Sequence, residues 1–229
     1  MSPSLREGQL SWANSWTSTA PLSATSTSPW STKSGLDTTD YGPNNYLRGD
    51  SLARKEIRIS GFGGQGVVLS GQILGQAASI HNSGFATLTQ SYGPEARGGA
   101  CTAEIVISDE PIDYPYVQEP DVVIVLSQEA YTRYAQNSAA LLIIDPDLVK
   151  VGAGQKEPLK IPATRMAREM GRVVVANIIM LGYLAALSDV VTSEGLRQAV
   201  LDSVPKGTEE FNARAFQTGH EYGLEHGRR

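Results

Sequence analysis

Two kinds of apolar pattern take turns along most of this chain: short apolar runs typical of strands, and longer segments with apolar residues at helical spacing. Five short runs are rich in β-branched and aliphatic residues and predict strands: Glu56–Ser60, Ala86–Gln90, Ala103–Ser108, Asp121–Leu126 and Leu141–Asp145. The last two are apolar throughout, which is typical of strands covered on both faces of a parallel sheet. Helical spacing follows the first and fourth runs, at Val67–Ile80 and Gln128–Gln136. We therefore expect a doubly wound α/β fold, with a mostly parallel sheet flanked by helices.

The final third of the chain changes to helical patterns alone. Four helices are predicted there: Ala163–Met170, Val174–Leu187, Ser193–Val204 and Thr208–His226. Thr192 or Ser193, followed by Glu194, favours a helix start. The second helix is almost wholly apolar but too short for the roughly 20 residues of a membrane span. It belongs either in the core or in a subunit contact, and the sequence leaves both open.

The first 52 residues differ from the rest. They are rich in serine and threonine, hold all three tryptophans of the chain, and show no regular apolar period. Such a segment cannot bury enough apolar surface to offset its ordering entropy, so we predict a disordered tail before a folded domain at 53–229. An over-extended translation start is the alternative. A secretory signal is not expected, because no basic start precedes an apolar core.

Net charge and cysteine content argue against several classes of function. The net charge is −5 without a Lys/Arg cluster, so neither nucleic acid nor an anionic membrane is an expected partner. The single cysteine, Cys101, cannot alone form an internal disulfide or hold an iron–sulfur cluster. It begins an apolar run without a neighbouring histidine, and we expect a buried, unreactive thiol. A soluble cytoplasmic protein is the simplest interpretation, and no metal site is assigned to Asp109, Glu110 and Asp113.

A glycine loop is the first candidate site. Gly61, Gly63 and Gly66 have the spacing G-x-G-x-x-G, with Gly64 as a fourth glycine and Gln65 between, directly after a strand and before a helix. Backbone amides of such a loop, at a helix N-terminus, suit a phosphate. A NAD site would require an acid about 20 residues later, yet the run ending at Gln90 has none. A tight turn without a ligand is the structural alternative.

A second loop follows the second predicted strand. It contains Tyr92, Gly93, Pro94, Glu95, Arg97, Gly98 and Gly99. Glycine and proline disfavour regular structure here, and the loop should lie at the same end of the sheet as the glycine loop. Arg97 could pair with a phosphate or carboxylate, or simply with Glu95.

Together, the motifs Gly61–Val68 and Gln90–Gly99, followed by Pro111-Ile112 and Pro120-Asp121, resemble the gamma subunit of the 2-oxoacid:ferredoxin oxidoreductases. Asn177 also fits that family's pattern. The match runs from about Glu56 to Leu187, and the residues of its motifs are most similar to those of the 2-oxoglutarate branch.

The resemblance implies one subunit of a complex that decarboxylates a 2-oxoacid, forms an acyl-coenzyme A and reduces ferredoxin. It places thiamine diphosphate and iron–sulfur clusters on alpha, beta and, where present, delta subunits. It leaves no catalytic residue on this chain, but suggests that Gly61, Gly63, Gly64, Gln65 and Gly66 contact coenzyme A and that the Tyr92–Gly99 loop contacts the thiamine-bearing subunit. The alternatives are a free-standing nucleotide- or coenzyme A-binding module and a purely structural subunit.

Overall fold

A mixed β-sheet forms the centre of the structure. The computed structural model describes residues 54–93, 99–135, 140–152 and 157–227, and within these the sheet has six strands in the order β2-β3-β1-β4-β5-β6. The strands are β1 (Lys55–Phe62), β2 (Phe85–Tyr92), β3 (Ala100–Ser108), β4 (Val122–Val125), β5 (Leu141–Ile144) and β6 (Leu159–Lys160).

Strand direction is mostly parallel, as predicted, with one reversal. The pairs β1–β4, β4–β5 and β5–β6 are parallel. Strand β3 is antiparallel to both of its neighbours, β1 and β2. The short connection from Tyr92 to Ala100 explains the reversal, because a parallel return needs a crossover of a dozen or more residues. The predicted alternation of strand and helix therefore fails between β2 and β3. The two-residue strand β6 was not predicted.

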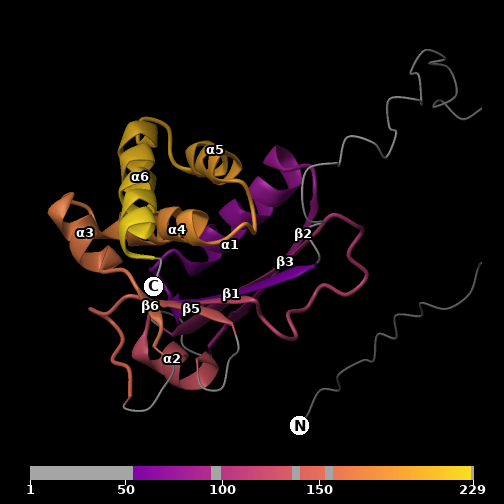
Figure 1. The fold of residues 1–229 in the computed structure, drawn as a ribbon, viewed down its shortest axis with the longest axis horizontal. Helices are drawn as coiled ribbons and strands as arrows, with labels where there is room; N and C mark the ends of the chain where they lie inside the picture. The colour runs from indigo at the N-terminus through magenta and orange to yellow at the C-terminus, as the bar shows by residue number, and fades with distance from the viewer. Residues whose placement is uncertain (1–53, 94–98, 136–139, 153–156, 228–229) are drawn as a thin grey trace, which may run out of the picture. The chain divides into compact units, whose positions relative to one another are not determined.

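Helices cover the two faces unequally (Figure 1). Among the described helices, α1, α3, α4, α5 and α6 lie on one side of the sheet, and α2 covers the β4–β5 part of the other face. The α-helices are α1 (Val67–Gln76), α2 (Gln128–Tyr134), α3 (Ala163–Glu169), α4 (Ala176–Leu187), α5 (Ser193–Ser203) and α6 (Glu209–His226), with a π-turn η2 (Ala77–His81) after α1 and a 3-10 turn η3 (Val173–Val175) before α4. Helices on both faces explain why β4 and β5 are apolar throughout, since side chains of both strands are buried on both faces of the sheet.

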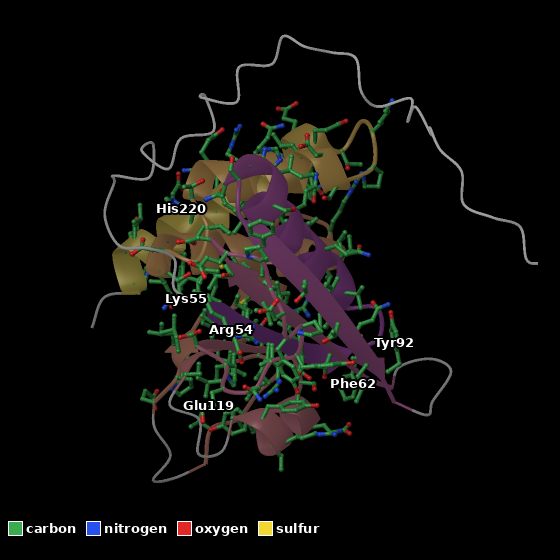
Figure 2. All side chains as sticks on the ribbon, turned by 90° about the vertical axis from the view of Figure 1, so that its right-hand side faces the viewer. Arg54, Lys55, Phe62, Tyr92, Glu119 and His220 are labelled. Atoms are coloured by element: carbon green, nitrogen blue, oxygen red, sulfur yellow. The ribbon has the colours of Figure 1, made fainter. Side chains whose placement is uncertain are left out.

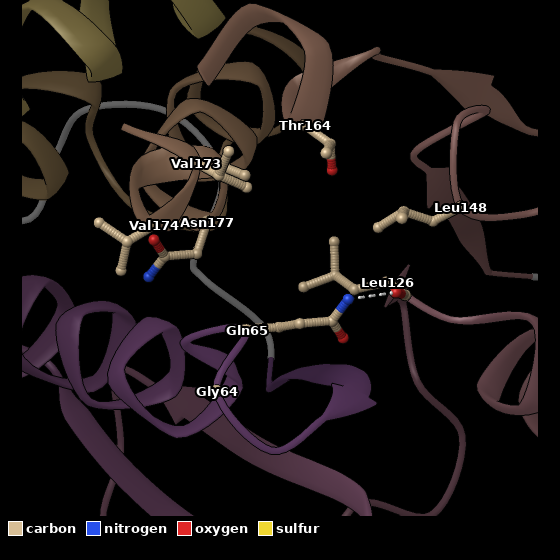
Figure 3. Close-up of a pocket in the computed structure, with 9 residues that line it drawn as sticks. Gly64, Gln65, Leu126, Leu148, Thr164, Val173, Val174 and Asn177 are labelled. Carbon is tan, nitrogen blue, oxygen red and sulfur yellow. Dashed lines mark hydrogen bonds between the residues drawn. The ribbon is translucent and has the colours of Figure 1, made fainter. Parts of the chain in front are cut away.

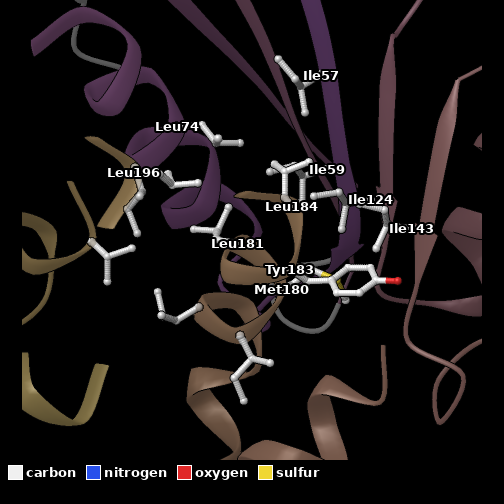
Figure 4. Close-up of a cluster of buried hydrophobic side chains, with 14 of the residues drawn as sticks. Ile57, Ile59, Leu74, Ile124, Ile143, Met180, Leu181, Tyr183, Leu184 and Leu196 are labelled. Carbon is white, nitrogen blue, oxygen red and sulfur yellow. The ribbon is translucent and has the colours of Figure 1, made fainter. Parts of the chain in front are cut away.

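The apolar helix α4 lies in the core of this chain, which settles the choice between core and subunit contact. Every residue from Asn177 to Leu184 is buried. Leu181 and Leu184 pack with strand residues such as Ile59 and Ile124 (Figure 4). The predicted start of α5 is confirmed at Thr192, whose hydroxyl accepts a hydrogen bond from the backbone N–H of Gly195 at 3.1 Å.

The chain order places a switch point between β1 and β4. After β1 the chain crosses to β2 at one side of the sheet, and it later returns to β4 on the other side of β1. Open α/β sheets bind ligands outside the carboxyl ends of strands at such a point. Phe62 and Tyr92 both lie at this end of the sheet, away from Lys55 at the start of β1 (Figure 2).

Residues 1–53 lie outside the described part, so the predicted tail and the domain boundary near residue 52 stay predictions. In the described segments, every helix falls short of the length and apolar character that crossing a membrane would require.

Candidate functional site

The glycine loop forms the predicted turn from strand to helix. It joins the end of β1 at Phe62 to the start of α1 at Val67. Gly64 and Gly66 have φ angles of 96° and 72°, in the left-handed region that side chains disfavour. Gly61 is needed for another reason, because a Cβ there would lie 2.9 Å from the Leu126 Cβ.

Gln65 fastens this loop to the end of β4. Its Oε1 accepts a hydrogen bond from the Phe62 N–H at 2.6 Å, and its Nε2 donates to the Leu126 carbonyl at 2.8 Å. The amide thereby bridges the two strands that flank the switch point. Gln65 was expected to contact a ligand, and the geometry adds a role in holding the loop in place.

The second loop reaches the first. The Gly63 N–H donates to the Gly99 carbonyl at 3.0 Å, and the Gly93 N–H donates to the Ala100 carbonyl at 2.7 Å. The Tyr92 side chain is 63% exposed at the end of β2. Pro94, Glu95, Arg97 and Gly98 lie outside the described residues. The described ends of the two loops thus meet at one end of the sheet.

A pocket of about 350 Å³ opens beside the glycine loop (Figure 3). It lies where three helices begin, since its walls include the residues just before α1, the second residue of α3 and the first two residues of α4. Its lining is Gly64, Gln65, Leu126, Leu148, Thr164, Val173, Val174, Ala176 and Asn177. The buried Asp145 carboxylate orients the α3 end by accepting the Thr164 N–H at 2.7 Å.

The electrostatics of the pocket come from backbone dipoles. Among its described lining residues, there is no Lys, Arg, His, Asp or Glu. Neither α1 nor α4 receives a side-chain cap at its first turn. The Ala176 N–H at the start of α4 already donates to the Val173 carbonyl, so the positive end of α1 is the better place for an anion. Leu126, Leu148, Val173 and Val174 give the walls an aliphatic character. The arrangement suits a ligand with an anionic group at the loop and an uncharged, partly apolar group in the pocket.

The topology also accounts for the missing ribose acid. Strand β2, whose end would hold that acid in a dinucleotide fold, is separated from β1 by β3. Gln90, near the end of β2, is exposed, and its Oε1 accepts a hydrogen bond from the Tyr92 hydroxyl at 3.2 Å. The glycine spacing here therefore belongs to a different ligand arrangement from the NAD site.

Other candidate residues lie apart from the pocket lining. Cys101 is 4% exposed, and burial raises the pKa of its thiol above 9.0, as an unreactive cysteine requires. Asp109, Glu110 and Asp113 are exposed, as expected. His81 pairs with Asp202 at 3.1 Å on the side of α5.

Sequence reasoning missed several pocket residues. Leu148, Thr164 and Val174 come from three separate segments, and nothing in their local sequence indicates a site. Asn177 did carry a signal, because it is a polar residue at the start of an apolar helix.

Comparison with known protein families identifies the chain. The family model described as "Pyruvate ferredoxin/flavodoxin oxidoreductase" matches residues 56–222. The chain belongs to this family. The match includes the glycine loop, the second loop and every helix that borders the pocket.

Members of the oxidoreductase family share both sequence and fold with this chain. The 2-oxoglutarate synthase subunit KorC of Methanocaldococcus jannaschii is 51% identical over 75% of this chain and 95% of its own length. A keto/oxoacid ferredoxin oxidoreductase gamma subunit from Geobacter sulfurreducens has a TM-score of 0.67 at 39% identity, covering 76% of this chain and 98% of the solved chain.

A larger relative shows the same fold as part of a longer chain. The 2-oxoglutarate:ferredoxin oxidoreductase from Magnetococcus marinus, solved with 2-oxoglutarate, coenzyme A and succinyl-CoA bound, matches with a TM-score of 0.68 at 22% identity. The match covers 77% of this chain but 32% of that one. At this identity the likeness concerns the fold alone.

Proposed function

We propose that this chain is the gamma subunit of a 2-oxoglutarate:ferredoxin oxidoreductase. The complex would convert 2-oxoglutarate and coenzyme A to succinyl-CoA and CO₂, with two electrons passed to ferredoxin. The observation that carries the proposal is the 51% identity to a 2-oxoglutarate synthase subunit along 95% of that subunit's length. Its alpha and beta partners, a delta subunit where present, ferredoxin and a cytoplasmic location all belong to this proposal.

The chain's own contribution would be the coenzyme A side of the active site. Coenzyme A combines phosphates with an uncharged pantetheine arm and an adenine ring. Phosphates fit the amides at the α1 N-terminus, and uncharged groups fit a pocket without charged lining residues. Gly64, on the wall of that pocket, has no atom within 4 Å of a Cβ placed on it, which leaves room for a ligand beside the loop.

Thiamine and cluster chemistry are assigned to the partner subunits. A cluster needs several thiolates, and this chain has one cysteine, which is buried. Thiamine diphosphate would supply the decarboxylation chemistry when bound to its own subunit. The second loop, including Arg97, would face that subunit and close the site.

Reconstitution tests the proposal. The partner subunits are purified with and without this chain, and ferredoxin reduction is measured with 2-oxoglutarate, pyruvate or 2-oxoisovalerate as substrate. Activity should require this chain and should favour 2-oxoglutarate. Full activity without the chain would overturn the subunit assignment, and a clear preference for another 2-oxoacid would overturn the branch.

Arg97 provides a narrower test of the second loop. Arg97→Ala should slow turnover or weaken association with the thiamine-bearing subunit, as measured by steady-state kinetics and gel filtration of the complex. If neither quantity changes, the loop is only a connector.

A further inference from the structure

The pocket beside the glycine loop has room for part of coenzyme A rather than the whole molecule. Pockets for small ligands and cofactors span roughly 300–1,000 Å³, and this one has about 350 Å³. Coenzyme A has two ends joined by its pyrophosphate: a pantetheine arm with two amides, and an adenosine with a 3′-phosphate. The lining of the pocket indicates which end enters.

The walls of the pocket are mainly aliphatic. Leu126, Leu148, Val173 and Val174 line it, and the two valines are 49% and 71% exposed at the turn before α4. Because the described lining residues are all uncharged, they offer no countercharge to the 3′-phosphate that lies next to the adenine. The walls therefore favour the pantetheine arm, whose chain alternates short apolar segments with amides.

Thr164 brings a hydroxyl to the pocket. It is the second residue of α3, and its backbone N–H donates to the Asp145 carboxylate at 2.7 Å, which fixes its position. None of the described residues bonds to the Thr164 Oγ1. This oxygen is directed into the pocket (Figure 3). The hydroxyl is thus available to donate a hydrogen bond to a ligand.

Asn177 brings an amide from a second helix, α4. The residue is 4% exposed, and its Nδ2 lies 3.5 Å from the Gly66 carbonyl oxygen, so the amide nitrogen faces the glycine loop. No donor for the Asn177 Oδ1 exists among the described residues.

The Asn177 Oδ1 must therefore reach accessible space. In the described segments, every side-chain nitrogen or oxygen that solvent cannot reach has a hydrogen-bond partner. Since the Oδ1 has none, it borders accessible space, and Asn177 is a lining residue of the pocket. A ligand that displaces water there must supply a donor, because an oxygen left without a partner weakens binding.

We infer that the pocket takes the pantetheine arm of coenzyme A, with the Asn177 Oδ1 accepting from an amide N–H of the arm and the Thr164 hydroxyl donating to an amide carbonyl. The inference rests on the proposed function, in which the glycine loop holds the phosphates. The aliphatic walls contact the carbon chain between the amides. Both residues select the end of the ligand that enters, and neither takes part in the chemistry.

Competition in the assembled complex tests which end enters. 4′-Phosphopantetheine carries the arm, adenosine 3′,5′-bisphosphate carries the other end, and each is measured as an inhibitor against coenzyme A. Thr164→Val removes the hydroxyl, so the inhibition constant of phosphopantetheine should rise about three- to tenfold, as expected for one neutral hydrogen bond. That of the bisphosphate should stay within about twofold. A rise for the bisphosphate, or no rise for either probe, would overturn the inference.

Thr132→Val is the matched control. Thr132 is also a helical threonine, with its Oγ1 donating to the Gln128 carbonyl at 3.0 Å, but it lies in α2 outside the pocket lining. Both inhibition constants should keep their wild-type values. If this variant weakens phosphopantetheine binding as much as Thr164→Val does, the effect is general and the inference fails.

Altered ligands test the Asn177 oxygen. Phosphopantetheine with an ester in place of either amide lacks one N–H donor. Asn177→Ala should weaken binding of the normal probe but not of one of the two ester analogues, because that analogue has no N–H for the Oδ1 to accept. Equal losses for the normal probe and both analogues would limit Asn177 to supporting the loop and refute its contact with the arm.

Gly66→Ala separates this inference from the proposed function. If Gly66→Ala raises the KM for coenzyme A but Thr164→Val leaves phosphopantetheine binding unchanged, the pantetheine assignment fails and the proposed function stands. If neither variant changes the KM for coenzyme A, the coenzyme A role of the chain fails and this inference falls with it.

Discussion

Glycines serve opposite purposes in two regions of this molecule. In the loop before α1, Gly64 and Gly66 have left-handed backbones, and Gly64 borders open space. At the crossing of α4 and α6, Gly182 and Gly219 are helical, and a Cβ on either would overlap a backbone carbonyl of the opposite helix, that of Phe216 or Ile179. The loop needs glycine for a conformation beside a pocket, whereas the crossing needs it for close packing. Mutation at the crossing should therefore change stability alone, whereas mutation in the loop should also change ligand binding.

The largest effect is expected at the helix crossing. Gly219→Val should destabilise the chain by about 3 kcal/mol or more, because overpacking here meets rigid backbone rather than a movable side chain. Thermal unfolding measures the loss. The fraction that still folds and assembles should keep the wild-type KM for coenzyme A. A stable variant with a raised KM would contradict the division between the two regions.

Gly66→Ala should affect both stability and binding. A left-handed alanine costs roughly 1–2 kcal/mol, and its methyl group would also displace Asn177. We expect a lower melting temperature and a higher KM for coenzyme A. Gly64→Ala is the control for strain alone, since nothing in the structure lies within 4 Å of its Cβ. If Gly64→Ala costs more stability than Gly66→Ala, the contact with Asn177 is unimportant.

Gln65→Leu should have a smaller effect on stability. Leucine keeps the bulk but leaves the Phe62 N–H and the Leu126 carbonyl without the side-chain partner that each now has, at a cost of about 1–2 kcal/mol. Denaturant unfolding measures this cost, and the KM for coenzyme A should rise because the loop loses its tie to β4. An unchanged KM with reduced stability would make the bridge purely structural.

The smallest effect concerns alkaline pH at the helix crossing. Burial, and secondarily the charge of Tyr222, raise the pKa of Tyr183 to about 12 from 10.0. Because the folded pKa is higher, the unfolded chain releases its proton first, and the stability contributed below pH 10 is lost as the pH rises toward 12. The free energy of unfolding, measured against pH between 10 and 12, should therefore fall more steeply for the wild type than for Tyr183→Phe. Parallel curves would show that Tyr183 is not the group responsible.

Local pattern predicted most elements and the position of the glycine loop. The strand at Val122–Val125 and the turn at Gly64 and Gly66 depend on residue types that are adjacent in the chain, so both could be predicted from the sequence. The reversal of β3 and the short strand β6 were not, because both depend on which strand pairs with which. The same holds for Gln65, whose side chain bonds to Leu126 across 61 positions.

The sequence by itself determined the class of fold, the strand–glycine–helix turn and the family resemblance, since these rest on residue type and short-range spacing. Only the tertiary structure decided that the apolar helix α4 lies in the core, that the two loops meet at Gly63 and Gly99, and that Asn177 stands against Gly66. Those contacts join residues 36 and 111 positions apart, and their geometry follows from the packing of the sheet and helices rather than from any local preference.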